Sequence, residues 1–264
     1  MWNEKGAKQV LTVGQEEKHA FTLVPSISAS GVLLPMQAVF HGQTLQFCPS
    51  AKAPRYDEAK KLGYHCVPSK TATYWSNLQT MQRLVKDIIK PYFDKTKEEL
   101  SLPESQCSIW KIDCWSVHRS DEFVTWMKDF NPTIIIIFIP GGCTGLWQPL
   151  DVGIQRVMKL SIKRSAHRDI VREVLKQLEA EMGHDIHIDT RLGILRDMSV
   201  GWIVDTIKEI DKPELILKVS VPYICYISML INTYTRLSNF AKSEISIVCK
   251  RASPLLKHLQ LSGT

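Results

Sequence analysis

The chain has 264 residues, of which 44% are hydrophobic, so it is long enough for one globular domain with a sizeable core. The formal net charge of +6 favours an anionic partner, although an even spread of cations would give the same total. The seven cysteines form no C-x-x-C pair, so the sequence does not predict a zinc site. No apolar run reaches the roughly 20 residues that span a bilayer, so no membrane partner is expected.

The first forty residues contain three short β-prone runs, Gln9–Val13, His19–Ser28 and Val32–Phe40, separated by turn-forming residues. This pattern predicts an antiparallel meander. Residues 42–69 are rich in Pro, Ser, Lys and Gly and show no sustained period. We expect them to form a surface excursion.

The middle of the chain predicts a helix, a strand and a second helix. Apolar residues recur at spacings of three and four from Asn77 to Phe93, which is typical of an amphipathic helix, and Ser76 could cap it. A short β-prone run follows at Ser108–Asp113. Ser120 precedes two acidic residues and marks the start of a helix that should reach about Asp129.

The run Thr133–Ile139 consists of β-branched residues and one Phe without polar alternation, which is typical of a strand covered on both faces. After a glycine-bearing loop at 140–149, a helix should begin beyond Asp151. Its expected inner face consists of Ile154, Val157, Leu160, Ile170, Val171, Val174 and Leu178. Hairpins followed by strand–helix–strand–helix indicate an α/β layered domain.

Two carboxylates stand out because each follows a predicted strand. Asp113 ends the first of these strands, and Asp151 begins the helix after the second. Parallel strands bring their carboxyl ends to one edge of a sheet, where two or three carboxylates can hold a pair of Mg²⁺ ions for phosphodiester chemistry. Alternatively, Asp151 is a helix cap and Asp113 pairs with a nearby arginine.

Two motifs resemble those of DDE-type, pogo/Tigger-like transposases. The segment Lys111–His118 looks like the signature at that family's second catalytic aspartate, and the segment Phe138–Gly153, with its Gln148-Pro149-Leu150-Asp151 run, is similar to the one that carries the third. The resemblance covers residues 2–218. It implies an RNase H-like mixed sheet flanked by helices, lacking the first strand, over residues 1–218, followed by a divergent tail at 219–264.

The resemblance also implies a site and a function. Asp113 and Asp151 would be the second and third ligands of a two-metal site for Mg²⁺ or Mn²⁺, and no aspartate near the start of the chain matches the first. The implied activity is DNA cleavage and strand transfer in the nucleus, by a chain that could form a homodimer. Two alternatives stay open: a catalytically inactive DNA-binding remnant, and a decayed reading frame that folds poorly.

His118 lies five residues after Asp113 and could orient its carboxylate or a phosphate, or serve as an ordinary structural histidine. The loop glycines Gly141, Gly142 and Gly145 could let backbone N–H groups approach a phosphate, or could only permit the turn.

The helix after Asp151 carries a basic stripe that could follow a nucleic-acid backbone, or could be a solvated helix face. Trp147, in the preceding loop, is a candidate for stacking on a base. The expected contacts on the helix are Arg156, Lys159, Lys163 and Arg164.

Overall fold

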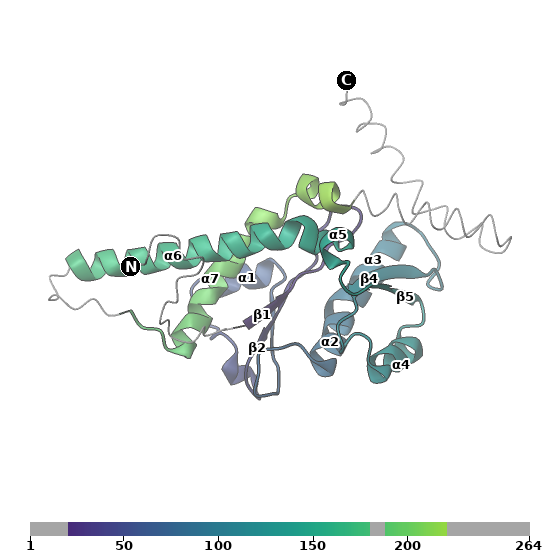
Figure 1. The fold of residues 1–264 in the computed structure, drawn as a ribbon, viewed down its shortest axis with the longest axis horizontal. Coiled ribbons are helices and arrows are strands. Elements are labelled where there is room, and N and C mark those ends of the chain that lie inside the picture. Colours follow the sequence, from purple (N-terminus) through teal and green to yellow (C-terminus); the bar gives the residue numbers. More distant parts are fainter. Residues whose placement is uncertain (1–20, 180–187, 221–264) are drawn as a thin grey trace, which may run out of the picture.

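The computed structural model describes residues 21–179 and 188–220. These residues form a mixed α/β fold with two small sheets flanked by helices (Figure 1), which confirms the expected class. The strands are β1 (Phe21–Val24), β2 (Gln37–Phe40), β3 (His65–Pro68), β4 (Ser108–Asp113) and β5 (Ile134–Ile139). The α-helices are α1 (Tyr56–Lys61), α2 (Leu78–Leu84), α3 (Lys90–Glu99), α4 (Asp121–Phe130), α5 (Thr144–Trp147), α6 (Gln155–Glu179) and α7 (Leu192–Ile210), with a 3-10 turn η1 (Leu45–Phe47) and π-helical turns η2 (Val85–Ile89) and η3 (Leu150–Ile154).

The first sheet has the order β1-β2-β3. Strand β1 is antiparallel to β2, and an isolated bridge between Ile27 and Leu33 extends this hairpin. The antiparallel pairing expected for this part of the meander is therefore confirmed, while the run Gln9–Val13 lies outside the described residues. Strand β3 is parallel to β2.

The expected surface excursion at residues 42–69 is wrong in its second half. This segment contains α1, where Ala59 is buried, and β3, where Val67 is buried. Both elements are short, so neither repeats often enough to show a period in the sequence. Pairing with β2, rather than local propensity, defines the strand.

The second sheet is the parallel pair β4-β5, in which Asp113 lies opposite Ile139. Both strands were predicted, but the expectation that β5 is covered on both faces is wrong in part. Ile134 is buried, whereas Ile135, on the opposite face, is 47% exposed; that second face is buried only at the end of the strand, at Ile139. Successive side chains point to opposite faces of a sheet, and α4 together with the α2–η2 helix covers the face to which Ile134 belongs.

Helix α2 is capped by Asn77 and not by Ser76. The Asn77 side chain accepts a hydrogen bond from the Thr80 N–H (3.1 Å), and the Thr80 hydroxyl oxygen accepts one from the Asn77 N–H (2.8 Å). The two side chains thus form a capping box. The helix then continues through η2 and α3 to Glu99, beyond the expected end at Phe93.

Two hydrogen bonds join the first sheet to the start of α2. The Asn77 amide donates to the carbonyl of Ser69, just after β3, at 2.6 Å. The amide of Gln37, on β2, donates to the carbonyl of Thr80 at 3.1 Å. The connection at 70–76 is exposed at residues 70–73 and buried at Ser76, and these two bonds hold the parts of the fold on either side of it.

The described residues have two apolar cores. The first lies between the β1-β2-β3 sheet, α7 and the start of α6, and the second lies between the α2–η2 helix, the β4-β5 sheet and α4. Helix α4 begins after Ser120, whose hydroxyl accepts a hydrogen bond from the Phe123 N–H at 3.2 Å, as predicted.

Helix α6 packs against α7 through small side chains, and its predicted inner face is largely wrong. Ile154 is buried and Val157 packs on the first core, but the other side of α6 carries most of the predicted residues. The residues that do face the core side are Met158, Ser161 and Ser165. The predicted inner residues Leu160, Ile170, Val171 and Leu178 are exposed.

A last helical segment at 213–220 passes the expected domain boundary at residue 218. Val219 is buried, and a Cβ atom placed on Gly153 would lie 2.4 Å from one of its methyl carbons. Residues 221–264 of the expected tail lie outside the described ranges. Among the described residues, no helix has the length and apolarity needed to cross a membrane.

Candidate active site and basic helix

Asp113 ends β4, and its carboxylate is held by the segment that follows. His118 Nδ1 lies 2.6 Å from Asp113 Oδ1, and the Trp115 N–H donates to the same oxygen at 3.4 Å. The hydrogen bond from His118 is the main reason that the pKa of Asp113 lies below its ordinary range, against the opposing effect of burial. Asp113 is therefore an ionised carboxylate with one oxygen already engaged.

His118 is fixed between aromatic rings. Its side chain is only 13% exposed and lies edge-on to Trp115, with ring centroids 5.4 Å apart, and 6.3 Å from the ring centroid of Phe123. The expected contact between His118 and Asp113 is thus present. His118 donates this hydrogen bond only when Nδ1 carries a proton.

Asp151 is the second residue of the π-helical turn η3. The N-terminal cap of η3 is Pro149, so the alternative that Asp151 caps the helix does not hold. Its N–H donates to the carbonyl of Gln148 at 3.0 Å, and its side chain is partly exposed. Asp113, similarly, is bonded to a histidine and not to an arginine of the described segments.

The loop between β5 and η3 lies against the carboxyl end of β4. Lys111 Nζ donates to the carbonyl of Trp147 at 2.8 Å, and a Cβ atom on Gly141 would lie 3.5 Å from the sulfur of Cys114. Lys111 precedes Asp113 by two positions, so both side chains leave the same face of β4. Burial lowers the pKa of Lys111.

Lys111 is a site residue that the sequence motifs did not single out. Its position two residues before Asp113 was the available signal, but its partner is a backbone carbonyl 36 positions away, which a sequence pattern cannot identify. Its bond connects the strand that ends in Asp113 to the loop that leads to Asp151.

The carboxylates do not form a complete metal centre within the described ranges. Residues 21–179 and 188–220 contain no group of three His, Cys, Asp or Glu side chains arranged to hold a metal ion. Asp113 and His118 are brought together, whereas the contacts found in this part of the chain do not join Asp151 to either of them. Asp113 and Asp151 have the oxygen ligands that Mg²⁺ and Mn²⁺ accept, so they fit part of such a site.

The loop glycines differ in what the backbone requires of them. Gly142 has a φ of 76°, which favours glycine, whereas a Cβ atom on Gly145 would meet nothing within 4 Å. The Cys143 N–H already donates to the carbonyl of Pro140 at 3.1 Å. These observations fit the turn-forming role of the loop.

Trp147 is half-buried at the end of α5. It lines an apolar hollow of about 450 Å³ together with Leu146, Val152 and residues of the 213–220 helix. Lys218 supplies the one charged side chain among the residues that line this hollow. Trp147 thus borders an accessible hollow, and its stacking on a base stays a prediction.

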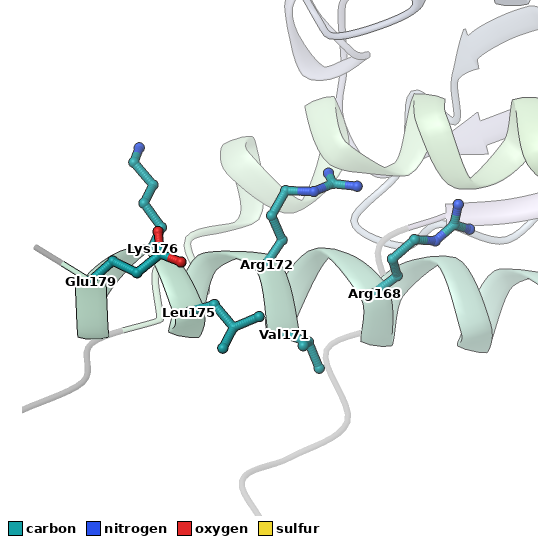
Figure 2. A pocket seen from close by; sticks show the side chains of 6 residues that line it. All are labelled: Arg168, Val171, Arg172, Leu175, Lys176 and Glu179. Carbon is teal, nitrogen blue, oxygen red and sulfur yellow. The ribbon is translucent and has the colours of Figure 1, made fainter.

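The basic residues of α6 divide into two groups. Arg164 lies 3.5 Å from Glu209, Arg168 lies 2.8 Å from Asp205, and Arg172 pairs with Asp169 on its own helix. In contrast, one group of cations is exposed and has no ion pair with any residue in the described part of the chain. This group consists of Lys176, near the end of the helix (Figure 2), and of Arg156, Lys159 and Lys163, which lie together near its start.

Comparisons with known proteins do not assign the chain to a family: no protein-family model matches it, and neither a curated protein nor a solved structure matches it.

Proposed function

We propose that the chain binds DNA through the basic face of α6, defined as Arg156, Lys159 and Lys163, as part of a transposase-like domain. The observation that supports this proposal most directly is that these cations are exposed and unpaired within residues 21–179 and 188–220. Their spacing of three and four residues places them on one side of the helix. They form a row that a phosphate backbone could follow.

Unpaired cations are suited to this task because no internal ion pair has to break before a phosphate binds. Each phosphate that they neutralise releases counterions from DNA, so the affinity should fall steeply with salt. Ser161 and Ser165 mark the opposite, buried side of α6. The fold therefore supports α6 from behind and leaves its basic face accessible.

The test measures DNA affinity by fluorescence anisotropy over a series of salt concentrations. Replacing both Lys159 and Lys163 with Glu should weaken binding at least about tenfold and reduce the slope of log K against log salt by about 1.8, that is, about 0.9 for each lost phosphate contact. Lys52→Glu is the control, since Lys52 is exposed on a different segment. Equal affinities for the double variant and the control would contradict the proposal.

A second candidate function is metal-dependent cleavage of DNA at Asp113 and Asp151. It is favoured by the His118 hydrogen bond, which keeps the Asp113 carboxylate ionised and oriented. Bound Mg²⁺ or Mn²⁺ would activate water and stabilise the leaving oxygen of a phosphodiester. In this reaction Asp113 and Asp151 would hold the cation, and His118 would position Asp113.

One set of variants distinguishes DNA cleavage from DNA binding. Asp151→Ala and Asp113→Asn should abolish Mg²⁺- or Mn²⁺-dependent nicking of plasmid DNA while leaving the anisotropy measurement within about twofold, because neither residue belongs to the basic face. Binding that is unaffected by chelators, together with no nicking by the unaltered chain, would instead support the inactive DNA-binding alternative.

A further inference from the structure

Two cysteines that are separated in the sequence meet in the first apolar core. Cys48 directly follows η1 and is buried, whereas Cys66 lies on β3 and is half-buried. Both are free thiols, and their side chains are hydrogen-bonded to each other. The segment between them contains α1 and returns the chain so that β3 lies against η1. The contact between the thiols is therefore a product of the tertiary fold.

The thiol pair lies within a group of polar side chains in an otherwise apolar core. The Tyr56 hydroxyl, on α1, is 3.9 Å from the sulfur of Cys66. Tyr64, just before β3, is buried, and its hydroxyl has no hydrogen-bond partner among the described residues. The titratable and charged groups that face the two sulfurs are Tyr56 of α1, Tyr64, Arg83 of α2 and Arg196 of α7.

Arg196 places a buried positive charge beside Cys48. Its side chain donates to the carbonyl of His41 at 3.2 Å, and its guanidinium carbon lies 5.5 Å from the centre of the Phe47 ring. Its Nε has no hydrogen-bond partner within the described ranges, and its charge interacts with Cys48. A buried cation is costly unless a negative charge lies close to it. A thiolate shared by the two sulfurs supplies such a charge.

The two sulfurs differ in how readily they lose a proton. The hydrogen bond from Cys48 lowers the pKa of Cys66 against the opposing effect of burial, and the Tyr56 hydroxyl lowers it further. The same hydrogen bond, together with burial, raises the pKa of Cys48. Cys66 is therefore the thiolate of the pair and the more accessible sulfur, while Cys48 keeps its proton.

We propose that Cys48 and Cys66 form an oxidation site, at which hydrogen peroxide converts the two thiols into an internal disulfide. The Cys66 thiolate attacks one peroxide oxygen, the O–O bond breaks and hydroxide leaves, so that Cys66 becomes a sulfenic acid. The sulfur of Cys48 then attacks the sulfur of Cys66. The S–O bond breaks, and the hydroxyl leaves with the Cys48 proton as water. The thiols lose two electrons, which reduce the peroxide.

The contact between the sulfurs makes the second step intramolecular, so it should outpace further oxidation of Cys66. Exposure alone would instead favour oxidation of Cys107, which is the exposed cysteine of the described segments. The order in which these cysteines react therefore separates a built site from simple accessibility. The site shares no residue with the basic face of α6, so this inference does not rest on the proposed DNA binding.

Peptide mapping by mass spectrometry tests the site in the unaltered full chain, after treatment with hydrogen peroxide and alkylation of the remaining thiols in denaturant. A peptide cross-linked between Cys48 and Cys66 should form while Cys107 is still reduced, and dithiothreitol should reverse it. Oxidation of Cys107 while Cys48 and Cys66 stay reduced overturns the proposal. A disulfide from Cys66 to any other cysteine overturns it as well.

Three variants test the roles of the two sulfurs. In Cys48→Ala, oxidation of Cys66 should stop at the sulfenic acid, which dimedone traps and mass spectrometry detects. In Cys66→Ala, Cys48 should stay reduced, because it is buried and protonated. Cys107→Ala is the matched control and should form the disulfide at the same rate as the unaltered chain. Sulfenic acid on Cys48 and not on Cys66 would overturn the assigned order of attack.

The pH dependence of the oxidation tests Tyr56 as a positioning residue. Tyr56→Phe keeps the ring but removes the hydroxyl near the Cys66 sulfur, so the oxidation of Cys66 should shift to higher pH, because only the thiolate reacts. Tyr64→Phe is the control, since the hydroxyl that it removes has no hydrogen-bond partner among the described residues, and it should leave the pH profile unchanged. Identical profiles for Tyr56→Phe and the unaltered chain would overturn this role.

Discussion

The Asp113–His118 pair sets the electrostatics of the candidate site. A carboxylate whose pKa is lowered in the folded chain contributes stability above its pKa in the unfolded chain and loses that contribution as the pH falls through the lower, folded value. The bond therefore stabilises the fold at neutral pH and ceases to do so in strong acid.

Replacing His118 with Ala should raise the pKa of Asp113 toward its ordinary range. The cost in unfolding free energy should be about 1 kcal/mol at pH 7, less than is usual for a bond to a charged group, because Asp113 is 36% exposed. Titration of the Asp113 carboxyl carbon by NMR, with urea unfolding at pH 7 and pH 3, measures both effects. His118→Asn keeps a hydrogen-bond donor, so its Asp113 pKa and its unfolding free energy should lie between those of the unaltered chain and His118→Ala. An Asp113 pKa that does not move in His118→Ala would show that the bond has no electrostatic effect.

Neighbouring cations on α6 should contribute unequally to DNA binding. Glu209 competes with phosphate for Arg164, whereas Lys163 has no competing acid among the described residues. Lys163→Gln should therefore reduce the slope of log K against log salt by about 0.9, and Arg164→Gln by less. Equal reductions would show that the pair with Glu209 does not persist in solution.

At the scale of single elements, the sequence predicted those that are long or strongly biased. The β-branched run indicated β5, and Ser120 with its acidic neighbours marked α4. The patterns missed α1 and β3, because four to six residues cannot display a period and β3 is defined by pairing with β2. The contacts of the candidate site also differ in how far the sequence could predict them. His118 contacts Asp113 because the two are five residues apart in the chain, whereas the bond from Lys111 to Trp147 depends on tertiary packing.

The sequence predicted that helix α6 forms but not which of its sides faces the protein. Its periodic apolar residues indicated a helix, but periodicity does not reveal which side faces the protein. Ser161 and Ser165 allow close approach to α7, and the larger apolar residues lie on the opposite side. The helix was confirmed, and the inner face assigned to it was wrong.

The start of α2 should depend on Asn77 more than on Ser76. Asn77→Ala removes the capping bond to Thr80 and the bond to Ser69, so we expect a loss of about 2 kcal/mol, one typical cap plus one further hydrogen bond. Ser76→Ala should cost less than about 1 kcal/mol, because its hydroxyl bonds the Thr80 side chain and not the helix backbone. Urea unfolding compares the two variants, and a larger loss for Ser76→Ala would show that the wrong residue is named as the cap.

At the scale of the whole molecule, the close approach of Gly153 to Val219 joins η3, just before α6, to the last described helical segment. Gly153→Ala should destabilise the fold by roughly 1–3 kcal/mol, because the new methyl group would overlap Val219. Val219→Ala should remove the overlap, so the double variant should lose less than the two single variants combined. Thermal unfolding of all four proteins provides the test, and strict additivity would contradict the contact.

The two bonds that hold the start of α2 against the first sheet have a consequence for chain connectivity. Since Asn77 and Gln37 already join these parts, the exposed residues 70–73 of the connection need not hold them in place. New termini opened within it by circular permutation, or a short peptide inserted there, should leave the fold intact. An unbroken backbone at this connection would then not be required for the fold.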